Sequence, residues 1–151
     1  MDAIQLLKSD HETVRDLLEK LTETTERASK TRKDLLEKIE KELKVHTTIE
    51  EEIFYPAVRD AGGRERAVMV AEAREEHRAV DELVLPDLLH TDVGSVQFSG
   101  RAKVLKELIE HHAEEEEEEM FPDARKALGK AELEKLGEQM MARKEELEGK
   151  L

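Results

Sequence analysis

The chain of 151 residues contains no cysteine and no tryptophan, and only 3% of its residues are aromatic. Without cysteine there can be no disulfide, thiolate-ligated zinc, iron–sulfur cluster or thiol catalysis. The sequence also has no apolar run long enough to span a membrane. Its first residues lack the basic and apolar regions of a secretory signal. We therefore expect a cytoplasmic protein.

Basic residues are in the minority, since 25 Lys and Arg stand against 38 Asp and Glu, for a formal net charge of −13. This balance argues against a nucleic-acid partner, which would need a basic patch to displace counterions, and against an anionic membrane surface. Charged residues make up 42% of the chain, and only three prolines and seven glycines interrupt it. Such a composition is typical of long amphipathic helices. The expected fold class is all-α, in a single domain.

Apolar residues recur at steps of three and four along the chain, which is the spacing of amphipathic helices. The pattern predicts helices over residues 2–28, 32–58, 64–90, 98–128 and 130–151. Pro56 is expected to mark the end of the second helix, while Gly62-Gly63 and Gly129 are expected at turns. Short connections favour an up-down-up-down bundle over residues 1–128. Residues 129–151 are predicted to form an additional C-terminal helix, which either packs on the bundle of a monomer or forms a homodimer contact.

Histidine and glutamate, both metal-ligand residue types, repeat at one fixed spacing. A 66-residue offset separates His11 from His77, His46 from His112, and Glu50 from Glu116. All six occupy positions at which the helical pattern calls for an inward-facing residue. Counting along antiparallel helices at 1.5 Å per residue places the six at nearly one level. The repeat therefore predicts a single site assembled from both halves of the chain.

Two His-x-x-x-Glu pairs each place a nitrogen and an oxygen donor on one face of a helix. Six groups exceed the four that a structural zinc site prefers, but they suit two metal ions that share bridging carboxylates. Imidazole and carboxylate donors without sulfur favour iron or manganese, with zinc as a further option. The alternative is a metal-free His/Glu network, which would bury several polar groups at an energetic cost.

The glutamates beside the predicted ligands leave alternatives open. Glu115 or Glu117 would join or replace Glu116 if its helix were locally rotated, and Glu51 stands in the same relation to Glu50. We expect the other members of the Glu114–Glu119 run to form a solvated face.

Tyr55 carries a hydroxyl that its partner at the 66-residue offset, Phe121, lacks. Its phenol can donate a hydrogen bond to a bound oxygen ligand or can ligate iron, so Tyr55 is the one candidate catalytic side chain outside the metal centre. His90 and His111 fall outside the register and are expected at the surface.

These motifs resemble the hemerythrin-like, or HHE cation-binding, family over residues 2–128. The resemblance rests on Asp10-His11, His46-x-x-x-Glu50 before Phe54-Tyr55-Pro56, Glu76-His77, and His112-x-x-x-Glu116 before Phe121-Pro122. It implies a four-helix bundle around a non-heme di-iron centre with oxygen or peroxide as the small-molecule ligand. The two iron ions would be held by His11, His46, Glu50, His77, His112 and Glu116.

The sequence departs from oxygen-carrying hemerythrins on its third helix, where Ala73 and Asp81 flank His77 in place of a further histidine. The chain also resembles a pattern whose last carboxylate lies five residues beyond its histidine, and there it offers Glu117 as well as Glu116. Fewer imidazoles favour irreversible chemistry over oxygen release. We therefore expect a di-iron protein of oxygen or oxidative-stress response, and leave peroxide-decomposing or oxidase-type activity open. The alternatives are a non-catalytic iron sensor or metal-binding module, and an acidic scaffold without metal.

Overall fold

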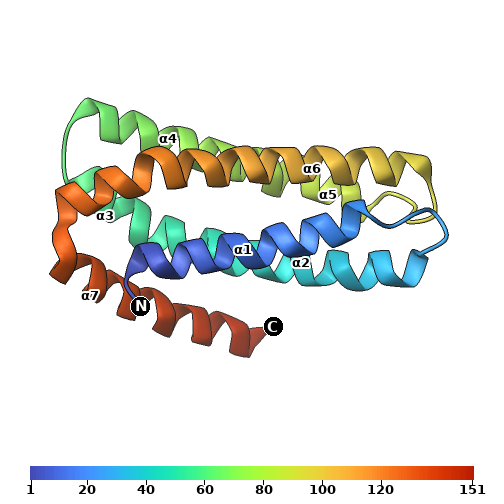
Figure 1. Ribbon diagram of the computed structural model, residues 1–151, viewed down its shortest axis with the longest axis horizontal. Coiled ribbons are helices and arrows are strands. Elements are labelled where there is room, and N and C mark those ends of the chain that lie inside the picture. The colour runs from blue at the N-terminus through green and yellow to red at the C-terminus, as the bar shows by residue number, and fades with distance from the viewer.

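The computed structural model describes residues 1–151 and contains helices but no strands. The first long helix is α1 (Ala3–Thr22). The second runs without a break through α2 (Ser29–Ile49), the π-helical turn η1 (Glu50–Phe54) and α3 (Tyr55–Asp60). The third comprises α4 (Arg64–Ala79), η2 (Val80–Val84) and α5 (Leu85–Leu89). The fourth comprises α6 (Val96–Glu115), η3 (Glu116–Met120) and the first part of α7 (Phe121–Lys150). Figure 1 shows these four helices lying side by side, each running opposite to the one before it. The predicted up-down-up-down bundle with an additional C-terminal helix is therefore confirmed.

The first helix ends earlier than the predicted residue 28. Its start is fixed by a capping box, in which Asp2 accepts from the Gln5 backbone N–H and the Gln5 side chain accepts from that of Asp2. At the other end, the Thr24 hydroxyl donates to the Leu21 carbonyl, and the buried Arg32 guanidinium donates to the Thr24 hydroxyl and carbonyl. These contacts hold the chain in a turn after Thr22.

A π-helical turn interrupts each of the second, third and fourth helices at an equivalent place. Each turn is closed by a backbone hydrogen bond over five residues, as from the Tyr55 N–H to the Glu50 carbonyl. A proline follows each turn, at Pro56, Pro86 and Pro122. The prediction that Pro56 ends the second helix was wrong, because proline without an N–H is tolerated where the hydrogen-bond pattern changes. Single π turns within helices often mark functional sites.

Two apolar clusters fill the bundle on either side of a polar layer. One contains Ile4, Phe54 and Phe121, and the other contains Leu18, Ile39, Leu43, Phe98 and Leu105. The four predicted histidine ligands lie between these clusters, one along each long helix. The polar layer is thus shielded from water along the bundle axis in both directions.

The chain reverses at Gly129, whose φ of 78° falls in the left-handed region that glycine adopts without strain. The rest of α7 then runs back beside α1 (Figure 1). Its Leu133, Leu136 and Met140 are buried in the first apolar cluster. Gly137 allows this approach, because a Cβ there would overlap the Met1 carbonyl oxygen and lie 2.7 Å from the carbonyl carbon of Asp2. None of the helices combines the length and apolar character needed to cross a membrane.

Candidate metal centre

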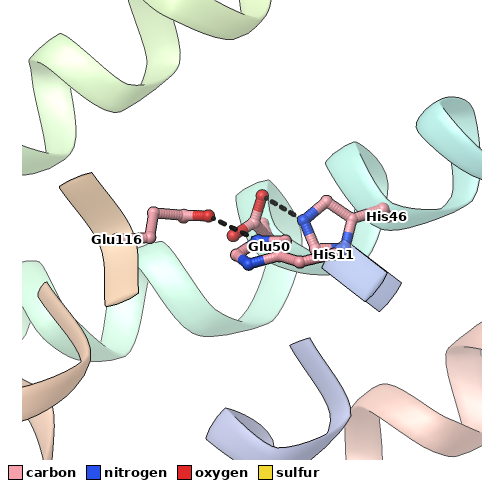
Figure 2. Close-up of side chains that lie close together, drawn as sticks. All are labelled: His11, His46, Glu50 and Glu116. Carbon is pink, nitrogen blue, oxygen red and sulfur yellow. Dashed lines mark hydrogen bonds and ion pairs between the residues drawn. The ribbon is translucent and has the colours of Figure 1, made fainter. Parts of the chain in front are cut away.

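Four imidazoles, one from each long helix, converge in the middle of the bundle. His11 comes from α1, His46 from α2, His77 from α4 and His112 from α6, and each is only 5–8% exposed. Glu50 and Glu116, the first residues of η1 and η3, are 0% and 2% exposed. Figure 2 shows His11, His46, Glu50 and Glu116 pointing toward one another. All six predicted site residues are thus brought together.

The Nε2 atoms of the four histidines face the two buried carboxylates. Oε1 of Glu50 lies 3.0 Å from Nε2 of His46 and 3.1 Å from Nε2 of His77. Oε1 of Glu116 lies 3.0 Å from Nε2 of His11 and 3.4 Å from Nε2 of His112.

The donor atoms form two compact groups, within each of which all donors lie within 4.8 Å of one another. One group consists of His11, His46, Glu50 and Glu116, and the other of Glu50, His77 and His112. Glu50 belongs to both. The arrangement is that of two neighbouring cation sites with a shared carboxylate.

The outer Nδ1 atom of every one of these histidines is held by a further carboxylate. The pairs are His11 with Glu117 at 2.7 Å, His46 with Asp10 at 2.9 Å, His77 with Glu51 at 2.7 Å and His112 with Glu76 at 2.7 Å. Because a carboxylate accepts, Nδ1 donates its proton outward, and Nε2 is the ring nitrogen that faces the centre. Such carboxylate partners orient the histidine ligands of metal sites.

These four outer carboxylates obey the same 66-residue offset as the inner ligands. Asp10 and Glu76 precede the first and third histidines, while Glu51 and Glu117 follow the two buried glutamates. The sequence analysis missed their role, since it treated Glu51 and Glu117 as alternative ligands and the other two as flanks of a motif. The repeat itself was the signal that would have found them.

The contacts of the Glu114–Glu119 run show which of its glutamates faces the centre. Glu116 alone is buried, whereas Glu115 pairs at 2.7 Å with the exposed His111. The expectation that the remaining members form a solvated face was wrong for Glu117. His11 contacts Glu117 through Nδ1 and Glu116 through Nε2. Arg15 lies 2.9 Å from Glu117 as a second partner.

Tyr55 places a hydroxyl group inside the centre. The hydroxyl donates to Oε2 of Glu116 at 2.7 Å and lies 3.2 and 3.3 Å from Nε2 of His77 and His112. Its ring stacks on His77, with centroids 5.4 Å apart, as the ring of Phe121 stacks on His11 at 5.7 Å. Burial and the nearby Glu116 carboxylate raise the pKa of Tyr55 well above its usual value. The phenol therefore stays protonated.

The state of the buried polar groups tests whether these residues fit a metal. Burial disfavours a charged imidazole, yet the Glu50 and Asp10 carboxylates raise the pKa of His46 to about 10. Both oxygens of Glu50 and Nε2 of His46 are buried without a hydrogen-bond partner of good geometry. Leaving such groups unpaired is costly. Metal cations would satisfy these atoms together, so the residues present fit a metal centre.

A cavity of about 120 Å³ opens onto the four histidines. Its other walls include the apolar residues Val14, Leu43, Val80, Leu108 and Ile109. Glu76, Asp81 and His111 also line it. One water molecule occupies about 30 Å³ in the liquid, so the cavity has room for a diatomic or similarly small molecule.

Known proteins are similar to this chain in sequence and in fold. The Hemerythrin HHE cation binding domain family model matches residues 2–148, which reaches into the C-terminal helix. An uncharacterized protein of Mycobacterium tuberculosis, Rv2633c, and one of Mycobacterium bovis are each 33% identical to the chain, over 99% of its length and 89% of theirs.

The crystal structure of a Hemerythrin HHE cation binding domain-containing protein, the Rv2633c homolog from Mycobacterium kansasii, superimposes with a TM-score of 0.86. It is 32% identical, and the match covers 99% of this chain and 89% of that one. The chain belongs to the hemerythrin HHE cation-binding domain family.

Proposed function

We propose that the chain is a non-heme dinuclear metal protein whose cofactor is two iron ions. The observation that carries the proposal is the orientation of the four histidines, each of which directs Nε2 to the centre while a carboxylate holds Nδ1. Nitrogen and oxygen donors without sulfur suit iron or manganese, with zinc as a further option. The metal ligands would be His11, His46, Glu50, His77, His112 and Glu116.

The two carboxylates would have the bridging role. Glu50 contributes to both donor groups, and Glu116 lies near histidines from each of them. Shared carboxylates hold two cations close together and offset the charge of both. The π turns support this role, because the wider turn of η1 or η3 starts at each of these glutamates.

We infer that the small-molecule ligand is oxygen or peroxide. Bound iron would supply the electrons and the open coordination positions for such a ligand. The protein supplies a small cavity with partly apolar walls, which has room for a small molecule beside the four histidines. Tyr55 supplies a buried hydroxyl group next to both donor groups. Ala73 and Asp81 beside His77 leave the centre with four imidazoles, which favours oxidation chemistry over reversible oxygen transport.

The deciding experiment is element-resolved metal analysis of protein purified from iron-supplemented cells without chelator. About two irons per chain is the expected result for a site of this kind. Zinc or manganese at the same stoichiometry would keep the dinuclear site and redirect the chemistry. Protein that is stable and free of metal would refute the proposal and favour an acidic scaffold bundle.

A non-catalytic metal sensor is the second candidate, and the buried unpaired atoms of Glu50 and His46 favour it. A centre built around such atoms makes folding stability depend on metal occupancy. Oxygen and peroxide consumption by the iron-loaded protein separates the two functions. Repeated turnover supports the reactive centre, whereas metal-dependent stability without consumption supports the sensor.

A further inference from the structure

The C-terminal helix reaches the metal centre through one ion pair. Nζ of Lys144, in the last part of α7, lies 2.6 Å from Oδ1 of Asp10. The other oxygen of this carboxylate, Oδ2, accepts from Nδ1 of His46 at 2.9 Å. Asp10 thus connects Lys144, which lies 134 positions further along the chain, to the candidate metal ligand His46.

We propose that Lys144 is a positioning residue of the metal centre, which holds the Asp10 carboxylate in the orientation that His46 needs as a ligand. The proposal rests on the proposed metal function. It assigns the C-terminal helix a role beyond packing, because docking of that helix and metal affinity at His46 become thermodynamically linked.

Burial explains why Asp10 depends on Lys144. Asp10 is 3% exposed, whereas its repeat equivalent Glu76 has a side chain that is 25% exposed and can be hydrated. Apart from His112, which it holds, the nearest basic side chain to Glu76 is the exposed imidazole of His111, at 3.8 Å. A carboxylate as buried as Asp10 is costly to leave without a close cation. The C-terminal part of α7, which packs beside Asp10, supplies this cation as Lys144.

The orientation of His46 follows from this contact. In its observed orientation Asp10 binds Lys144 through one oxygen and His46 through the other. Without Lys144, the free oxygen would be drawn toward water, and its partner oxygen would move away from Nδ1. His46 would then be held less firmly, and Nε2 would point to the centre for a smaller fraction of the time. Such losses behind a ligand lower metal affinity.

Docking of the helix does not itself require Lys144. Leu133, Leu136 and Met140 bury the apolar face of the helix. Arg143, the preceding residue, forms a separate two-contact pair with the exposed Glu52, at 2.8 and 3.1 Å. Arg143→Gln is therefore a matched control that removes a helix-to-bundle ion pair without touching a carboxylate behind a histidine.

The experiment compares iron(II) affinity by chelator competition under anaerobic conditions in the wild type, Lys144→Gln, Lys144→Arg and Arg143→Gln. We expect Lys144→Gln to weaken binding roughly threefold to tenfold, which is less than the 10–100-fold typical of losing a carboxylate directly behind a ligand. Lys144→Arg should restore most of the affinity because it keeps a cation near Asp10. Arg143→Gln should stay within about twofold of the wild type, since exposed ion pairs contribute little.

Hydrogen exchange of residues 130–150 provides a readout that does not need a variant. Because coupling is reciprocal, iron binding should slow exchange in this segment of the wild type. Exchange that is unchanged by metal would overturn the proposal, even if Lys144→Gln failed to fold. Wild-type affinity in Lys144→Gln, or an equal loss in Arg143→Gln, would also overturn it. In those cases a wild type that still binds two irons keeps the proposed function intact, whereas a wild type that binds no metal refutes both.

Discussion

The Tyr55 hydroxyl donates a 2.7 Å hydrogen bond to Oε2 of Glu116. This bond makes the two repeat-related halves of the centre unequal. The repeat equivalent of Tyr55 is Phe121, which stacks on His11 as Tyr55 stacks on His77 but carries no hydroxyl. One half of the centre therefore has a hydroxyl that donates a hydrogen bond, and the other does not. A bound oxygen ligand that needs such a donor should depend on Tyr55.

Tyr55→Phe should keep metal stoichiometry but slow peroxide consumption by the iron-loaded protein. The ring and its stacking survive the change, while a preorganised hydrogen-bond donor is lost, and one such donor typically contributes at least about 100-fold to catalysis. Initial rates at matched iron content measure the effect. Phe121→Tyr is the companion variant, and its rate shows whether a hydroxyl on the other half can substitute. An unchanged rate in Tyr55→Phe would assign the tyrosine to packing.

His112→Ala should lower bound metal below two ions per chain, because one of the two donor groups loses an imidazole. The matched control is His111→Ala, which removes the neighbouring exposed imidazole. Metal analysis after identical purification measures both variants. Two irons in His112→Ala, with wild-type reactivity, would show that the ligand assignment is wrong.

Glu117→Gln should weaken metal binding about 10–100-fold, the range for losing a carboxylate that orients a histidine ligand. Glu118→Gln, at the next and exposed position, should leave affinity unchanged. Chelator competition distinguishes the two variants. Equal affinities would mean that the hydrogen bond between Glu117 and Nδ1 of His11 does not support the centre.

Removal of the metal should destabilise the fold, because the buried oxygens of Glu50 lose their partner. A ligand present at 1,000 times its Kd stabilises by about 4 kcal/mol. For a domain of this size that corresponds to a fall in melting temperature of about 10 °C. Calorimetry before and after chelation, and again after iron is restored, measures the change. A melting temperature indifferent to chelator would argue against both the reactive centre and the sensor.

Metal-free protein should lose stability as the pH rises from about 6.5 to about 10. Against the opposing effect of burial, Glu50 and Asp10 raise the pKa of folded His46 to about 10, from an ordinary value of 6.5. Between these values the folded state keeps a proton that the unfolded state has lost. The stabilisation is therefore fully present below pH 6.5 and is lost as the pH rises through 10.

Metal loading should flatten this dependence, because a metal ion replaces the proton on Nε2. Thermal melts of metal-free and metal-loaded protein across the same pH range provide the test. A metal-free melting temperature that holds steady or increases toward pH 10 would contradict the expected sign.

Much of the architecture was predictable because it depends on local periodicity. The helices over residues 64–90 and 98–128 match the structure within about two residues, since amphipathic spacing and the glycine turns act over a few positions. The early end of α1 was not predictable from that pattern, because it depends on Arg32 binding Thr24 from the next helix. The π turns were also missed, since a shift in hydrogen-bond register leaves the apolar pattern almost unchanged.

The sequence by itself determined which side chains face the interior and at what level, because helical pitch and the 66-residue repeat set both. Only the tertiary structure decided which carboxylate serves which histidine. Asp10 binds His46 of the neighbouring helix and not His11 beside it, because adjacent residues on a helix point in different directions. It also decided that Lys144 meets Asp10, since that contact exists only after the chain reverses at Gly129 and the last helix packs beside the first.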